Sequence, residues 1–159
     1  MEKIHGIITN EDIEKVIWLV VDNFLIPKFR ELNMNASGQW LEALSVKGIN
    51  GNRGEIWGKD YTYYLQHGRA GGTMPPVSAI EKWVGDKFGI YGREANQRAW
   101  AIAKKIQKEG TTYYPQGTDL IDVLYQSECQ RFIQQEMSKI YQNRLSLYML
   151  NMLKKLEKK

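Results

Sequence analysis

Residues 61–84 read YTYYLQHGRAGGTMPPVSAIEKWV, and this stretch is the most informative part of the chain. Its aromatic residues and threonine favour a strand over residues 61–66. The glycines that follow predict a sharp turn, because glycine adopts backbone conformations that other residues avoid. Pro75 and Pro76 then stand where a helix begins, since proline is tolerated in a first helical turn. The stretch therefore predicts a strand, a tight corner and a helix, in that order.

The predicted corner depends on a few residues that turn the backbone or pack beside it: Tyr64, Gly68, Arg69, Pro75, Pro76 and Trp83. Arg69 is expected to bond a nearby carboxylate or carbonyl, in the same chain or across a subunit boundary. The glycine-rich segment 68–72 is not followed by the Lys-Ser/Thr pair of a P-loop, and its glycines do not have the spacing of a dinucleotide-binding motif. A structural corner is therefore preferred here over a phosphate cradle.

An amphipathic helix is predicted before this stretch. Thr9 and Asp12 fit a capping box at its start, and apolar residues recur at three- and four-residue steps from Ile13 to Phe24. Pro27 should end or kink it. Trp18 and Leu25 lie beside or behind the apolar stripe, which indicates that this helix has a second packing partner.

A small antiparallel sheet is predicted between this helix and the corner. Residues 40–46 and 53–57 are strand candidates, and Asn50-Gly51 between them is a typical hairpin turn. Residues 61–66 add a further strand. We expect three or four strands in all, although residues 41–44 also fit a helix.

Helices are predicted for most of the rest of the chain. One follows Pro75-Pro76, and another covers residues 94–108 and ends at Gly110. A long helical tract then begins at Thr118-Asp119, where N-cap residues occur. It either breaks near Gln142-Asn143 or packs its far end, including Tyr148 and Met152, on a neighbouring subunit. The fold class is α+β, in a single domain over 1–159 whose part 118–159 is a C-terminal helical extension.

Composition limits the classes of function. The 159 residues carry a net charge of +4, and no apolar run approaches the ~20 residues needed to cross a bilayer. The basic excess lies in the tail, where Arg144, Lys154, Lys155, Lys158 and Lys159 outnumber Glu157. A basic tail is typical of a solvated helix end, with contact to DNA or an acidic partner as the alternative.

Little in the sequence points to catalysis or to a cofactor. His67 and Cys129 are the nearest approach to a base and a nucleophile, but Cys129 lies on the apolar stripe of a predicted helix. Neither residue has the spacing of a zinc ligand set. An enzyme is thus the least favoured class, and no metal or cofactor is expected. A nucleic-acid-binding module, with the aromatic strand as a stacking surface and the basic tail as an electrostatic one, remains the main alternative.

One order of elements resembles a known class of protein. A leading helix and small sheet precede Tyr63-Tyr64 and Gly68-Arg69, then Met74-Pro75-Pro76 with Ile80 and Trp83, then residues 99–103 with Ile106 and Gly110-Thr111. This order is similar to that of small tail-completion and head–tail connector proteins of tailed bacteriophages. The resemblance covers about a third of the chain.

The resemblance implies a non-enzymatic structural protein of the virion, made and assembled in the cytoplasm of a host bacterium. Such a protein forms part of a homo-oligomeric ring at the phage neck. Its partners would be copies of itself and other neck, portal or tail proteins, with incidental contact to packaged DNA and none to a membrane. Surplus apolar surface at Trp18, Leu25, Tyr148 and Met152 would supply the contacts between subunits.

Overall fold

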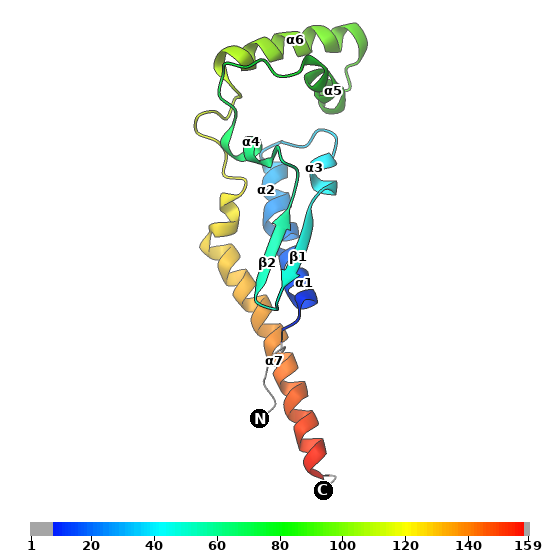
Figure 1. The fold of residues 1–159 in the computed structure, drawn as a ribbon, viewed down its shortest axis with the longest axis vertical. Coiled ribbons are helices and arrows are strands. Elements are labelled where there is room, and N and C mark those ends of the chain that lie inside the picture. The colour runs from blue at the N-terminus through cyan, green and yellow to red at the C-terminus, as the bar shows by residue number, and fades with distance from the viewer. Residues whose placement is uncertain (1–7, 158–159) are drawn as a thin grey trace. The chain divides into compact units, whose positions relative to one another are not determined.

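The computed structural model describes residues 8–157 and divides the chain into two compact units (Figure 1). The first unit takes in the chain up to Leu25, Ser45–Trp57 and the chain from Leu124 onward. The second takes in Ile26–Leu44 and Gly58–Val123. The fold is α+β as predicted: it is mostly helical, with a two-stranded antiparallel hairpin.

The first unit begins with the predicted amphipathic helix, α1 (Asn10–Val20). The capping box is confirmed, because the Thr9 hydroxyl accepts the Asp12 backbone N–H while the Asp12 carboxylate accepts the Thr9 backbone N–H. Ile13, Val16 and Val20 are buried, as the three- and four-residue spacing predicts. Local capping and apolar periodicity therefore place this helix correctly.

Pro27 does not end the helical path. The α-helical pattern changes at Val21 to a π-helical segment, η1 (Val21–Leu25), and α2 (Ile26–Glu31) follows with Pro27 as its second residue. A proline has no N–H to donate and crowds the carbonyl of the preceding turn. A wider π turn just before Pro27 relieves that crowding and keeps the path helical.

The sheet of this unit is a hairpin of β1 (Ser45–Ile49) and β2 (Arg53–Trp57). Its register pairs Ser45 with Trp57 and Ile49 with Arg53. The predicted turn is confirmed, since Asn50 and Gly51 both have positive φ angles of 52° and 66°. The prediction of three or four strands is wrong for residues 8–157, because residues 61–66 are almost entirely helical and residues 40–46 contribute only Ser45 and Val46, to β1.

Glycine allows α1 to lie close against this hairpin. Gly48 and Gly54 face each other across the two strands. A Cβ on Gly48 would overlap the backbone of Asn10, and one on Gly54 would overlap the Ile17 side chain. The Gly48–Gly54 pair therefore forms the flat place on the sheet where the helix passes.

The long C-terminal helix, α7 (Ser127–Glu157), completes the first unit. It runs antiparallel to α1–η1: the Phe132 ring meets the Phe24 ring at 5.4 Å, and Arg144 reaches Asp12 near the start of α1. The 31 residues form one unbroken α-helix, so the predicted alternative of a break near Gln142-Asn143 is wrong.

The predicted start of the C-terminal helix, at Thr118-Asp119, is also wrong. A short 3-10 turn, η2 (Asp122–Tyr125), precedes α7 instead. Asp119 is engaged elsewhere, because the Lys28 ammonium lies 2.6 Å from its carboxylate. The hydrogen bond from Lys28 holds the pKa of the Asp119 carboxyl below its ordinary value. An N-cap residue type is thus used here as an ion-pair partner within the second unit.

The Asp12 carboxylate joins α1 to α7 inside the first unit. It is buried, and its two oxygens lie 2.8 and 2.7 Å from Nη2 of Arg144. Burial by itself raises the pKa of the Asp12 carboxyl. The hydrogen bonds from the Thr9 backbone and hydroxyl, with those of Arg144, outweigh burial and leave the pKa below its ordinary value of 3.8.

We expect Asp12→Asn to lower the free energy of unfolding by about 2 kcal/mol at pH 7, because hydrogen bonds to a buried charge are lost. The depressed pKa also predicts a pH dependence. The stabilisation from ionised Asp12 is complete above pH 3.8 and is lost as the pH falls through the lower folded-state pKa. Urea unfolding between pH 2 and 7 measures both effects, and the variant should have the flatter profile.

Glu128→Gln is the matched control, since Glu128 is an exposed acidic residue in the first turn of another helix of the same unit, α7. It should change stability by less than about 0.5 kcal/mol. An equal loss in both variants would show that net charge, not the Asp12–Arg144 contact, sets the effect.

The second unit opens with α2 and continues into α3 (Gln39–Glu42). The prediction of a strand over 40–46 is therefore wrong for its first half, while Ser45 and Val46 belong to β1. The Trp40 indole explains the helix: it is buried, stacks on the Phe29 ring at 4.3 Å and donates its N–H to the Thr62 hydroxyl. Tertiary contacts around one tryptophan override the strand-like composition here.

The prediction of a strand over residues 61–66 is wrong as well. The segment forms a helix, α4 (Thr62–His67). Tyr61 and Leu65, four residues apart, line one apolar pocket of this unit; Tyr61 is 42% exposed, and Tyr63 and Tyr64 are more exposed, at 64% and 53%. This i, i+4 spacing is a helical signal. Gly68 then ends the helix with a φ of 71°.

Two helices after the prolines match their predictions. α5 (Val77–Phe88) begins directly after Pro76 and ends at Gly89, and α6 (Gly92–Glu109) ends at Gly110. The small residues Ala95, Ala99 and Ala103 are fully buried along α6, which packs closely against α5. Their size permits the close approach of the two helices.

Candidate interaction surfaces

The predicted corner is a junction between two backbone segments of the second unit. Residues 66–72 run alongside the end of α6 and the loop after it. The Arg69 carbonyl accepts the Thr111 N–H at 2.9 Å, and the Arg69 N–H donates to the Thr111 hydroxyl at 2.9 Å. Gly72 donates its N–H to the Gln107 carbonyl at 2.7 Å. These donors are engaged within the chain, which disfavours a phosphate cradle.

Glycines make this junction, named here the Gly68 corner, sterically possible. A Cβ on Gly68 would lie 2.7 Å from the Tyr114 backbone nitrogen, and one on Gly71 would lie 2.9 Å from the Lys108 carbonyl oxygen. Added Cβ atoms on Gly110 and Gly117 would overlap the carbonyl oxygens of Arg69 and Gln66. Backbone therefore packs on backbone at four places, and the corner is a fixed shape.

The other predicted corner residues have unlike surroundings. Arg69 donates from Nη2 to the Thr73 carbonyl oxygen at 3.3 Å, so its partner in this chain is a carbonyl. Pro75 is buried, and Pro76 is the exposed N-cap of α5. Trp83 is partly exposed and meets the Phe88 ring edge-on at 5.4 Å, while Tyr64 is exposed on α4.

An apolar pocket of about 400 Å³ lies in the second unit, beside α4. Aromatic residues dominate its wall: Phe29, Trp40, Tyr61 and Trp83. Burial raises the pKa of the Tyr61 hydroxyl. Lys82 and Asp86 bring opposite charges to the same wall. The pocket can accept a small apolar group.

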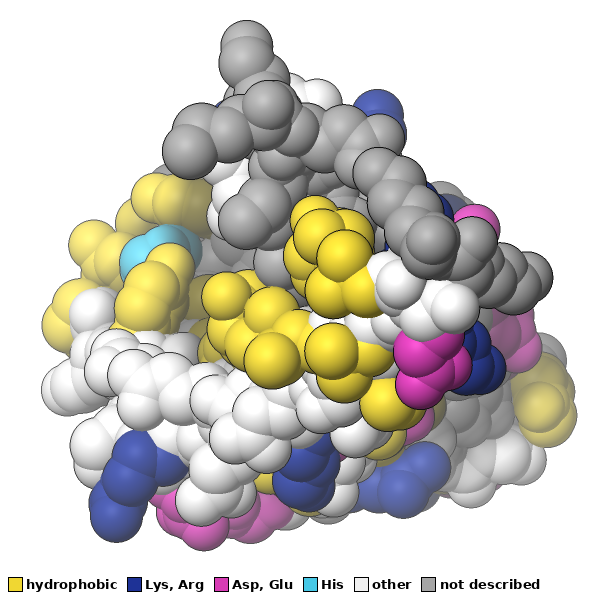
Figure 2. Space-filling model, turned by 90° about the horizontal axis from the view of Figure 1, so that it is seen from below, with side chains coloured by type: hydrophobic (Ala, Val, Ile, Leu, Met, Phe, Trp, Pro, Cys, Tyr) yellow, Lys and Arg dark blue, Asp and Glu magenta, His cyan; other side chains and the backbone are white. Residues whose placement is uncertain are grey.

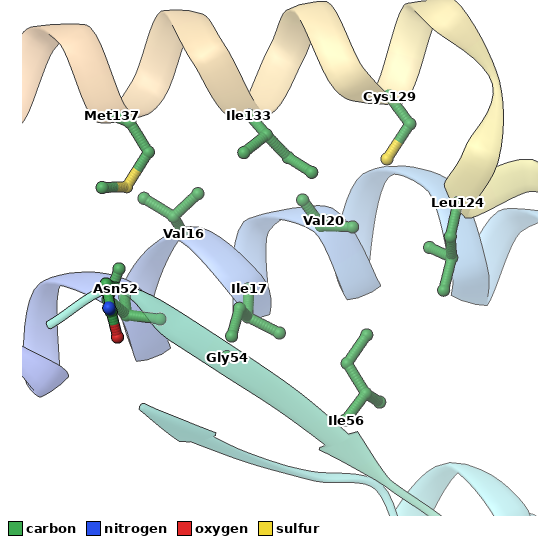
Figure 3. Close-up of a pocket in the computed structure, with 11 residues that line it drawn as sticks. Val16, Ile17, Val20, Asn52, Gly54, Ile56, Leu124, Cys129, Ile133 and Met137 are labelled. Atoms are coloured by element: carbon green, nitrogen blue, oxygen red, sulfur yellow. The ribbon is translucent and has the colours of Figure 1, made fainter. Parts of the chain in front are cut away.

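A second apolar pocket, of about 380 Å³, lies in the first unit between α1, β2 and α7 (Figure 3). Val16 and Val20 of α1 point towards Ile133 and Met137 of α7, and Ile56 closes the side at β2. The Cys129 thiol also faces this pocket. Burial raises the pKa of that thiol, which disfavours the reactive thiolate.

No group of three or more histidine, cysteine, aspartate or glutamate side chains within residues 8–157 is arranged to hold a metal ion. Over the same residues, no helix combines the length and apolar character needed to cross a membrane.

The distal half of α7 exposes large apolar side chains all around the helix. Seven of them are between 41% and 68% exposed: Leu147, Tyr148, Met149, Leu150, Met152, Leu153 and Leu156. Apolar side chains are also seen at the surface beside charged ones in Figure 2. The sequence prediction named Tyr148 and Met152 from one stripe of the helix. It missed the leucines on the other sides, although their close succession in the sequence was the signal.

A second exposed apolar surface lies on α1. Trp18 and Leu19 are each 40% exposed, and Trp18 lies on the side of the helix away from the buried Ile13 and Val16. Leu25 was predicted to share in an oligomer interface, but it is 1% exposed and belongs to the core of this chain. The π turn explains the difference, because it shifts the residues after Val20 relative to a regular helical stripe.

The basic residues near the C-terminus differ in whether they have an acidic partner. Arg144 is paired with Asp12, whereas Lys154 and Lys155 are exposed in the last turn of α7. Lysines there complement the helix dipole, as predicted. Lys158 and Lys159 lie outside the described residues.

Known proteins give no identification. No protein-family model matches the chain, and neither the curated proteins nor the solved structures include a significant match to it. Its function must therefore be inferred from its own surfaces.

Proposed function

We propose that this chain is a structural subunit of a tailed-bacteriophage particle and assembles with copies of itself into a ring at the neck or tail end. The observation that carries the proposal is the distal half of α7, which presents apolar side chains to solvent on all sides. Large exposed apolar surfaces in folded proteins mark sites of contact with other proteins. The sequence resemblance around residues 61–111 supports the phage assignment.

Two unlike surfaces favour a ring over a simple dimer. The distal half of α7 and the exposed side of α1 are different patches of one chain. A contact between unlike patches repeats from subunit to subunit, and it closes into a ring when the rotation allows.

The energetic scale is adequate for assembly. Complete burial of one large apolar side chain contributes about 1.5–3 kcal/mol, so a half-exposed one gains roughly 1 kcal/mol. If all seven side chains of distal α7 were covered, they would supply on the order of 7 kcal/mol, which is an upper limit for one contact, against an association cost of about 4–15 kcal/mol. One such contact alone is of marginal stability. In a closed ring each subunit makes two contacts, and the second contact adds further stabilisation.

The first test is the oligomeric state of the full chain. We expect size-exclusion chromatography with light scattering to give a closed oligomer, and Tyr148→Glu with Met152→Glu to convert it to monomer. Gln142→Glu with Asn143→Glu, which adds the same charge at exposed polar positions of α7, should leave the oligomer intact.

The phage assignment has its own test. Electron microscopy and mass spectrometry of purified particles should find the chain in assembled virions. A chain that stays monomeric at all concentrations, or that never enters particles, would contradict the proposed function.

A further inference from the structure

The two exposed apolar surfaces of the first unit carry opposite charge. The residues of α1 and η1 include Glu11, Asp12, Glu14 and Asp22 against Lys15, a net charge of 1 − 4 = −3. The sequence from residue 144 to 159 has five basic residues and Glu157, a net charge of 5 − 1 = +4. The Arg144–Asp12 pair cancels one charge on each side. An acidic excess remains on the first helix and a basic excess on the last.

Charge and apolar surface coincide on each helix. On α1, the exposed Glu11, Lys15 and Trp18 follow at four- and three-residue steps, so they share one side, and the exposed Asp22 lies just beyond the end of α1, in η1. We name this side, with Leu19 beside it, the outer face of α1. Within residues 8–157, Glu11 and Asp22 make no ion pair.

The distal half of α7 has the matching arrangement. Tyr148, Met152 and Lys155 follow at four- and three-residue steps, and all three are exposed. An aromatic ring, a flexible thioether and an ammonium group therefore share one side of this helix. They are suited to a surface made of a tryptophan, a leucine and carboxylates.

The two surfaces of one chain do not meet. The inner side of α1, with Ile13 and Val16, is covered within the unit, and Trp18 lies on the other side. Helix α7 is unbroken, and it passes the start of α1 where Arg144 meets Asp12. At 1.5 Å per residue, Leu156 lies about 18 Å further along the helix axis. Because α7 continues past the start of α1 without a break, its distal half projects away from the outer face of α1 in its own subunit.

We propose that the distal half of α7 docks on the outer face of α1 of a second copy of this chain. The contact places Tyr148 and Met152 against Trp18 and Leu19, and it brings Lys154 and Lys155 to the acidic residues that flank them. This inference rests on the proposed ring, because it assigns the two patches of the repeated contact. It is a head-to-tail contact between unlike surfaces, and not a bundle of α7 helices.

Charge reversal on each side tests this docking in the full chain. Lys154→Glu with Lys155→Glu should weaken self-association at least tenfold, and so should Glu11→Lys with Asp22→Lys. An equimolar mixture of the two variants should restore association, with the two variants in alternating order, because each acidic α7 then meets a basic α1 and each basic α7 meets an acidic α1. Analytical ultracentrifugation at low and high salt measures each case, and circular dichroism verifies that the variants are folded.

The controls separate this proposal from its alternatives. Asp60→Lys with Asp86→Lys makes the same charge change at exposed residues of the second unit and should leave association unchanged. Trp18→Ala should weaken association, whereas Trp100→Ala, at an exposed tryptophan of α6, should not. If Glu11→Lys with Asp22→Lys assembles like the unaltered chain, the docking proposal fails while the ring stands. If the unaltered chain is monomeric, the proposed function fails first.

Discussion

Replacing Gly110 with alanine should lower the free energy of unfolding by about 4 kcal/mol, through two separate effects. Gly110 ends α6 with φ 82° and ψ −168°, a backbone region that is almost restricted to glycine. Forcing another residue into that region costs about 1–3 kcal/mol. An added Cβ would also overlap the Arg69 carbonyl oxygen, and overpacking of this kind costs about 1–3 kcal/mol more.

The clash at Gly110 is severe because it involves backbone. The Arg69 carbonyl is held by the Thr111 N–H at 2.9 Å, and Gly72 is held by the Gln107 carbonyl at 2.7 Å. A side chain would rotate away from an intruding methyl group, but this backbone has no such freedom. We therefore expect Gly110→Ala to loosen the whole Gly68 corner.

Gly89→Ala is the matched control for this prediction. Gly89 ends α5 with a φ of 68°, so it also has a positive φ, but an added Cβ would meet nothing within 4 Å. Its expected cost is about 1–2 kcal/mol, from the backbone conformation alone. Urea unfolding followed by tryptophan fluorescence measures both, and hydrogen exchange at Thr111 reports on the corner itself. Equal losses in the two variants would show that the packing of backbone on backbone contributes little.

The sequence predicts the helices of this fold better than its strands, and the difference has a local cause. Helix α1 starts after Thr9, and α5 and α6 end at Gly89 and Gly110. Each of these helix ends is set by a capping residue that lies within a few residues of it in the sequence. Such signals require no knowledge of distant segments. The hairpin turn at Asn50-Gly51 is of the same kind.

The predictions that fail depend on distant contacts. Aromatic residues over 61–66 favour a strand, but a strand needs a neighbour to pair with, and the hairpin pairs only β1 with β2. The segment becomes α4 because Tyr61 and Leu65 face an apolar pocket formed in part by Phe29 and Trp40. Those partners lie more than 20 residues away in the sequence, so the local pattern does not reveal them.

The candidate surfaces follow the same rule. Apolar surplus on the first and last helices is visible in the sequence, and Trp18, Tyr148 and Met152 are exposed. Leu25 is buried, since one π turn changes which side of the helix it occupies. The Arg144–Asp12 pair joins residues 132 positions apart, and the sequence shows no signal for it.

Replacing Gly48 with alanine should cost about 3 kcal/mol, the second large effect that we expect. Its Cβ would overlap the carbonyl oxygen, Cα and carbonyl carbon of Asn10, at the start of α1. The Gly48 N–H also donates to the Glu14 carboxylate at 2.9 Å, and the Asn10 side chain accepts the Gly51 N–H at 2.8 Å. Moving α1 away to admit the methyl group would therefore stretch both of these hydrogen bonds.

Gly54→Ala provides a comparison within the same cross-strand pair. There the added Cβ would meet the ends of the Ile17 and Ile13 side chains, which can rotate into the apolar pocket between α1, β2 and α7. We expect a loss of about 1 kcal/mol for Gly54→Ala, since a flexible side chain yields where backbone does not. Urea unfolding of the two variants compares them directly. A larger loss at Gly54 than at Gly48 would mean that α1 moves on the hairpin more easily than its side chains repack, and it would overturn the view that Gly48 fixes the position of this helix.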